Sequence, residues 1–88
     1  MAERRRFTYK HVLVTGGARG IGLEIAQQFA VEGAILSIFD LNRLNLDSSA
    51  ESLRQKRTSV YTYEVDVADS RAVQKAVAIA ESVAPIDV

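Results

Sequence analysis

Apolar residues along the chain change their spacing several times, from continuous runs to a helical period and back again. The run KHVLVT at 10–15 is rich in β-branched residues and is followed by glycines, which predicts a strand buried on both faces. The next apolar residues recur at helical spacing, and this spacing predicts an amphipathic helix. Gly33 is placed to terminate that helix. The apolar residues of the helix are Ile21, Ile25, Ala26, Phe29 and Ala30. The next apolar run, AILSIFD at 34–40, predicts a second strand.

The second half of the chain repeats this alternation less strongly. Leucines within a mostly polar segment indicate a weaker helix over 43–56, whose first residue the pattern does not define. The segment SVYTYEVD at 59–66 alternates, which predicts a third strand with one less buried face. Asp69 or Ser70 then caps a helix with a stripe of valine and alanine, which ends before Pro85. The final IDV resembles the start of a fourth strand.

This order of elements predicts an α/β fold, a Rossmann-type doubly wound parallel sheet of order β-α-β-α-β-α-(β) that is incomplete. Right-handed crossovers place the first two helices on one face of the sheet and the third on the other, so the fourth strand would lie beside the first. We expect 1–9 to be a basic N-terminal tail and 10–88 to be the N-terminal portion of the domain. Strand 10–15 would then have an almost unpaired edge, which favours pairing with another chain and hence a homo-oligomer.

Composition narrows the classes of function. The chain of 88 residues is 48% hydrophobic and 25% charged, as in ordinary globular proteins, and its eleven basic residues balance eleven acidic ones. We therefore expect no nucleic-acid or membrane partner, although the arginines of the tail leave weak phosphate contacts open. The absence of cysteine excludes disulfides and thiol catalysis, and one histidine without cysteines predicts no metal site. No apolar run approaches the roughly 20 residues that span a bilayer, so a cytoplasmic location is expected.

A glycine-rich loop separates the first strand from the first helix. In TGGARGIG, the glycines Gly16, Gly20 and Gly22 have the spacing G-x-x-x-G-x-G. Glycine permits a tight turn, lets the backbone approach a pyrophosphate without a Cβ in the way, and allows close packing of helix and strand. The free N–H groups at the helix start, around Ile21 and Gly22, would meet the negative charge with the helix dipole behind them. The loop therefore predicts a dinucleotide site.

An acidic residue occurs where such a site requires one. Asp40 lies 18 residues after Gly22, at the carboxyl end of the second strand. Its carboxylate can accept both hydroxyls of an adenosine ribose and repels a 2′-phosphate, so NAD is expected rather than NADP. Arg19 in the loop and Arg43 after Asp40 could each hold a 2′-phosphate, which leaves NADP or dual use open.

The segment TGGARGIG resembles the T-G-x-x-x-G-x-G fingerprint of the short-chain dehydrogenase/reductase family, and FDLN and DVAD stand at matching intervals. The resemblance implies that Asp66 accepts the adenine amino group, that the backbone of Val67 lines the adenine pocket and that Leu41 flanks the adenosine. It also implies an NAD(P)-dependent oxidoreductase that transfers hydride between nicotinamide and an alcohol or carbonyl substrate.

Family members continue after this region with an N-N-A-G segment, a catalytic serine and a Y-x-x-x-K pair. None of these segments occurs in the 88 residues. In particular, no lysine stands four positions after any of the three tyrosines (Tyr9, Tyr61 and Tyr63), so the Y-x-x-x-K pair cannot be formed. We therefore assign no catalytic residue and expect this chain alone to be inactive, with any substrate pocket formed only in a complete enzyme. A non-catalytic short protein that binds nucleotide or dimerises remains the alternative.

Overall fold

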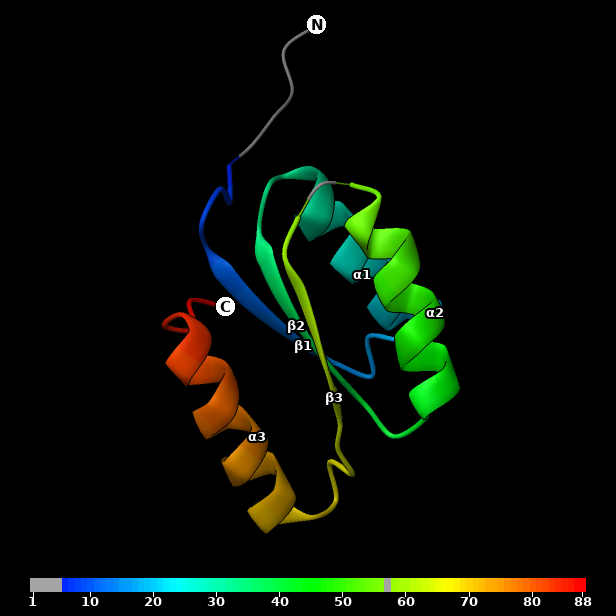
Figure 1. The fold of residues 1–88 in the computed structure, drawn as a ribbon, viewed down its shortest axis with the longest axis vertical. Coiled ribbons are helices and arrows are strands. Elements are labelled where there is room, and N and C mark those ends of the chain that lie inside the picture. Colours follow the sequence, from blue (N-terminus) through cyan, green and yellow to red (C-terminus); the bar gives the residue numbers. More distant parts are fainter. Residues whose placement is uncertain (1–5, 57) are drawn as a thin grey trace, which may run out of the picture.

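Strands and helices alternate along the chain as the sequence predicts. The computed structural model describes residues 6–56 and 58–88, so most of the basic tail, including Arg4 and Arg5, lies outside the described residues. The elements are β1 (His11–Thr15), α1 (Gly20–Val31), β2 (Ile35–Asp40), α2 (Arg43–Arg54), β3 (Val60–Glu64) and α3 (Ser70–Val83), arranged as in Figure 1.

The three strands form one parallel sheet in the order β1-β2-β3. Thr15 stands opposite Phe39, and Phe39 stands opposite Tyr63, so the strands end at nearly the same level. The loops that follow the three strands therefore meet at one edge of the sheet, where ligands of open α/β sheets bind.

Helices cover both faces of the sheet. Figure 1 shows α1 and α2 on one face and α3 on the other. The larger core, between the sheet and the first two helices, centres on fully buried Leu36, Ile38, Leu46 and Leu53. The smaller core lies under α3 and includes Phe39, Val65 and Ala76. Two helices on one face and one on the other confirm the doubly wound arrangement.

The last residues of the chain lie beside the free edge of β1 (Figure 1). The Leu13 N–H donates to the Val88 carbonyl at 2.8 Å, and the N–H groups of Asp87 and Val88 donate to the His11 carbonyl at 2.8 and 3.2 Å. These bonds are those of a parallel strand that has just begun, at the position predicted for the fourth strand.

Helix ends follow the local sequence. Gly33 adopts a positive φ of 87°. Its N–H donates to Ala30 at 3.0 Å, and the Ala34 N–H donates to Phe29 at 3.1 Å, which together form a Schellman motif. Asp69 caps α3 by accepting from two backbone N–H groups, which decides between the two predicted cap residues.

The single histidine is a buried member of β1. The His11 Nδ1 lies 2.7 Å from the Ala84 carbonyl, which can only accept, so Nδ1 carries the proton. The Nε2 therefore accepts from the Ser37 hydroxyl, also at 2.7 Å. The Asp87 carboxylate accepts from the backbone N–H of His11 at 2.9 Å. His11 thus joins β1, β2 and the segment after α3 with every polar atom satisfied.

Arg6 and Phe7, in the last part of the predicted tail, are anchored to the C-terminal end of α1. Arg6 pairs with Glu32 through both carboxylate oxygens, and this pairing raises the pKa of Arg6. The Phe7 ring meets the Phe29 ring edge to face, with centroids 4.9 Å apart. Among the described helices, none has the length and apolar character needed to cross a membrane.

Candidate cofactor-binding site

The glycine loop between β1 and α1 has the backbone shape that its composition predicts. Gly16 and Gly20 have positive φ values of 64° and 60°, which other residues rarely adopt. At Gly22, a Cβ would lie 2.1 Å from the Gly16 carbonyl oxygen, so only glycine allows the first turn of α1 to pack on the loop. A Cβ at Gly16 or Gly20 would meet nothing within 4 Å, which leaves open space on the outer side of the loop.

Gly17 also shapes the loop, although it stands outside the predicted glycine pattern. A Cβ at this position would lie 2.9 Å from a methyl group of Ile38 and 3.1 Å from one of Val14. The loop therefore lies flat against the ends of β1 and β2. The glycine doublet was the only signal in the sequence, since G-x-x-x-G-x-G spacing does not include its second member.

The N-terminus of α1 has no side-chain cap, whereas the other two helices are capped. Asn42 caps α2 and Asp69 caps α3, but Arg19, the N-cap residue of α1, makes no such bond. The first bond of α1 runs from the Leu23 N–H to the Arg19 carbonyl at 3.2 Å. In the part of the chain that the structure describes, the N–H groups of the first turn, at 20–22, have no acceptor. An anion placed here would meet three donors and the positive end of the helix dipole.

The carboxylate of Asp40 lies beside this loop, at the end of β2. One oxygen accepts from the Ala18 N–H at 3.1 Å. The other accepts from the N–H groups of Leu41 at 2.8 Å and Asn42 at 3.3 Å. The acidic residue that was predicted from its spacing is therefore in contact with the glycine loop.

A pocket of about 300 Å³ opens at this point, lined by Arg19, Asp40, Leu41, Asn42 and Asn45. Three of these residues were predicted, and the structure brings them together. The two asparagines were not, because nothing in the sequence distinguishes them from ordinary residues at the start of a helix. The Arg19 side chain has no ion-pair partner among the described residues, so a cation and a carboxylate face the same space.

The structure separates the two arginines that could hold a 2′-phosphate. Arg43 lies across β3, with its guanidinium 3.4 Å from the Glu64 carboxylate and 3.5 Å from that of Asp47. It lines a different depression, between β3 and α3. Arg19 alone of the two lines the pocket that contains Asp40.

Asp66 and Val67 follow β3, one strand further along the same edge of the sheet. Neither residue lines the Asp40 pocket. One Asp66 carboxylate oxygen accepts from the Ala68 N–H at 2.9 Å, which leaves the other oxygen available. Val67 is 59% exposed, Leu41 63% and Ile21 80%.

These groups can bind an anion at the loop and a hydroxyl group at Asp40. Among the described residues no group of three potential metal ligands occurs.

Comparison with known proteins gives consistent matches. Residues 10–88 match the protein family described as short chain dehydrogenase. A 3-dehydrosphinganine reductase of Arabidopsis thaliana is 38% identical over 80 residues, which are 90% of this chain and 24% of that protein.

Solved structures agree with the sequence matches. NAD+-bound xylitol dehydrogenase is 32% identical with a TM-score of 0.86, over 93% of this chain and 32% of the other. The L-sorbose reductase of Gluconobacter frateurii, complexed with NADPH and L-sorbose, is 32% identical with a TM-score of 0.85, over 97% of this chain and 32% of the other. The chain thus spans about a quarter to a third of the length of these relatives.

Proposed function

The chain belongs to the short-chain dehydrogenase family, and we propose that it is the cofactor-binding part of an NAD(P)-dependent oxidoreductase. In the complete reaction the nicotinamide cofactor supplies or accepts a hydride, and the other reactant is an alcohol or carbonyl compound. These 88 residues hold the cofactor but provide no acid, base or substrate pocket, so the chain alone is inactive.

One observation carries this proposal: the uncapped N-terminus of α1 and the Asp40 carboxylate open on the same edge of the sheet. The open space at Gly16 and Gly20 accommodates a pyrophosphate close to the backbone, and the first-turn N–H groups at 20–22 donate to it. A carboxylate next to an anion site fits a ligand whose phosphates are flanked by a ribose. Leu41 and Val67 are exposed at the ends of β2 and β3, and together with Asp66 they are the residues proposed to contact the adenosine part of the cofactor.

The same pocket favours NAD over NADP. The Asp40 carboxylate repels a 2′-phosphate, and of the two candidate arginines only Arg19 is placed to offset that repulsion. The two solved relatives bind different cofactors, NAD+ in one and NADPH in the other, so the proposed preference depends on the residues of this chain.

The test is a titration of the isotope-labelled chain with NAD and with NADP, followed by NMR chemical shifts, which register weak binding. Gly20→Asn places a side chain in the open space of the loop, and asparagine tolerates a positive φ. Gly33→Asn makes the same exchange at a positive φ at the other end of α1 and serves as the matched control.

We expect NAD to shift the loop resonances, Gly20→Asn to weaken binding about tenfold or more, and Gly33→Asn to leave it unchanged. Arg19→Ala should weaken NADP binding more than NAD binding. Equal loss of affinity in both asparagine variants would remove the loop from the proposal. NADP binding as tight as NAD binding in the wild type would overturn the predicted preference.

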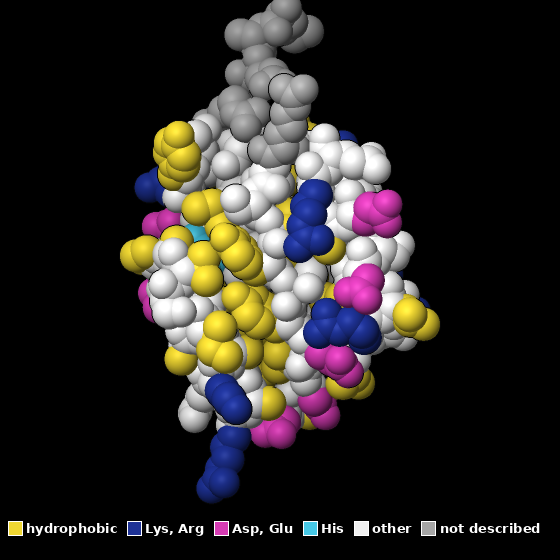
Figure 2. Space-filling model, in the orientation of Figure 1, with side chains coloured by type: hydrophobic (Ala, Val, Ile, Leu, Met, Phe, Trp, Pro, Cys, Tyr) yellow, Lys and Arg dark blue, Asp and Glu magenta, His cyan; other side chains and the backbone are white. Residues whose placement is uncertain are grey.

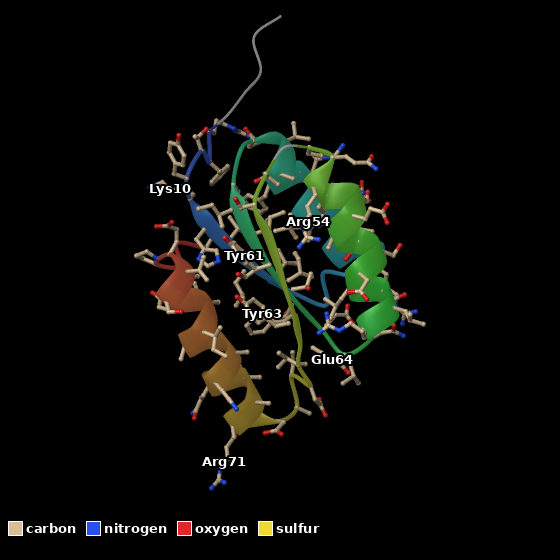
Figure 3. The ribbon with its side chains drawn as sticks, viewed as in Figure 1. Lys10, Arg54, Tyr61, Tyr63, Glu64 and Arg71 are labelled. Carbon is tan, nitrogen blue, oxygen red and sulfur yellow. The ribbon has the colours of Figure 1, made fainter. Side chains whose placement is uncertain are left out.

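Self-association is a second candidate function, favoured by an exposed apolar surface. Figure 2 shows hydrophobic side chains gathered between α3 and β3. Tyr61 and Tyr63 point from β3 toward α3 in Figure 3. Ile79 and Val83 of α3 are 47% and 43% exposed. We propose that this surface is covered in a homo-oligomer.

Sedimentation velocity over a range of protein concentrations tests this proposal. A monomer at every concentration would contradict it, and so would an Ile79→Ser variant that assembles as well as the wild type.

A further inference from the structure

We infer that Asp40 is a positioning residue for the glycine loop, in addition to its proposed contact with the ribose. Its carboxylate holds the loop at Ala18, so the ribose end and the pyrophosphate end of the site are mechanically joined. The inference rests on the proposed function, since it concerns how that same site is built.

The contact between Asp40 and Ala18 crosses from β2 to the loop that follows β1. The Ala18 N–H donates to one carboxylate oxygen at 3.1 Å, and Ala18 is 5% exposed, so the donor is largely shielded from water. From Gly17 to Gly22, this is the one backbone N–H with an acceptor in the part of the chain described. A bond to an ionised acceptor is stronger than one between neutral groups. Among the described residues, Asp40 therefore provides the only hydrogen bond that fixes the middle of the loop.

The carboxylate is nearly saturated without any ligand. A carboxylate offers about four acceptor positions. Ala18 uses one on the first oxygen, and Leu41 and Asn42 use both on the second. One position remains, on the oxygen that faces the loop, so a ribose hydroxyl bonded there binds next to Ala18. Ribose binding and the conformation of the loop thus depend on the same oxygen atom.

This arrangement has a consequence for cofactor specificity. Removing Asp40 eliminates the repulsion of a 2′-phosphate, but it also frees the loop that binds the pyrophosphate common to both cofactors. A substitution at Asp40 alone should therefore weaken the binding of both NAD and NADP instead of exchanging one for the other.

The first experiment measures amide hydrogen exchange at Ala18 in the ligand-free chain by NMR. We expect Asp40→Ala to speed this exchange about tenfold, as for loss of one charge-assisted hydrogen bond. Asp40→Glu keeps the carboxylate and should restore part of the protection. Asp47→Ala removes an equal charge from an exposed position on α2 and should change nothing at Ala18. Exchange in Asp40→Ala within twofold of the wild type overturns the inference.

Inorganic pyrophosphate provides the second readout because it has no ribose. Loss of a nearby negative charge alone would strengthen its binding, whereas a loosened loop would weaken it. We expect Asp40→Ala to bind pyrophosphate at least about threefold more weakly than wild type, since several donors lose their alignment. Equal or tighter binding overturns the coupling of the two ends.

Two further outcomes are decisive. If pyrophosphate and NAD bind to no form of the chain, the proposed function fails while the exchange rates still decide the role of Asp40. If Asp40→Ala does not fold, amide hydrogen exchange in the wild type tests the inference by itself. The Ala18 amide should exchange about tenfold more slowly than the amides of Gly17 and Arg19, and equal rates overturn the inference.

Discussion

Gly22→Ala is the substitution whose effect the structure defines most sharply. The added methyl group would lie 2.1 Å from the Gly16 carbonyl oxygen, 2.8 Å from its carbon and 3.0 Å from the Gly17 Cα. All three atoms belong to the backbone, so no side chain can rotate away. The Gly16 N–H is bonded to the Phe39 carbonyl at 2.7 Å, which holds the loop against β2. The methyl group must therefore push α1 or the loop away from the sheet.

The cost follows from the size of this displacement. Relief of the overlap requires a shift of roughly 1 Å in close-packed backbone. Overpacking of this kind costs about 1–3 kcal/mol, and here the displaced group is backbone, which favours the upper half of the range. Alanine gains up to about 1 kcal/mol over glycine in a helix interior and less in a first turn. We therefore expect a net destabilisation of about 2 kcal/mol, or roughly 8–16 °C in Tm for a chain of this size.

The assay is thermal and urea unfolding, followed by circular dichroism at 222 nm. Gly20→Ala is the matched control, because a methyl group there meets nothing within 4 Å and only the positive φ of 60° is unfavourable. That strain costs about 1 kcal/mol. Gly22→Ala should therefore be clearly less stable than Gly20→Ala. The reasoning is refuted if Gly22→Ala unfolds within about 0.5 kcal/mol of the wild type, or if the order of the two variants is reversed.

Two other variants test the packing of the domain. Ser37→Ala leaves the buried Nε2 of His11 without a donor and should cost about 1–3 kcal/mol in urea unfolding, so a loss under about 0.5 kcal/mol would contradict the assigned hydrogen bond. Asp69→Ala removes the cap of α3, which accepts from Arg71 and Ala72 at 3.1 and 3.2 Å, and should cost about 1 kcal/mol. Asp69→Asn should retain most of that stability, and equal destabilisation by both Asp69 variants in thermal unfolding would argue against capping.

Features with a short-range cause were predictable from the sequence. The spacing of apolar residues predicted the six elements, and the resulting order predicted which face each helix covers. Gly33 and Asp69 act within one turn of their own helix, so local sequence was sufficient to predict their roles. The G-x-x-x-G-x-G pattern belongs to the same class, because the loop must turn within a few residues.

Features with a long-range cause could not be predicted in this way. Arg19 and Arg43 are both close in sequence to a loop of the site, and only the direction of the first turn of α2 places Arg43 over Glu64. The structure assigns a hydrogen bond between Asp40 and Ala18, residues 22 positions apart. The spacing of Asp40 from the glycines predicted that it would lie near the ligand. It gave no indication that the carboxylate would also bind the loop, because that depends on the register of β1 and β2.

Strand β2 determines the shape of the glycine loop as much as the glycines do. Gly17 packs on Ile38, the Gly16 N–H binds the Phe39 carbonyl, and the Ala18 N–H binds Asp40, so three consecutive loop residues are held by three consecutive residues at the end of β2. Any unit that retains β1, α1 and β2 in register therefore keeps the conformation of the loop. This gives a physical reason why the proposed binding of a cofactor could be separable from catalysis: among the described residues, the contacts that shape the loop are all made by residues before position 41.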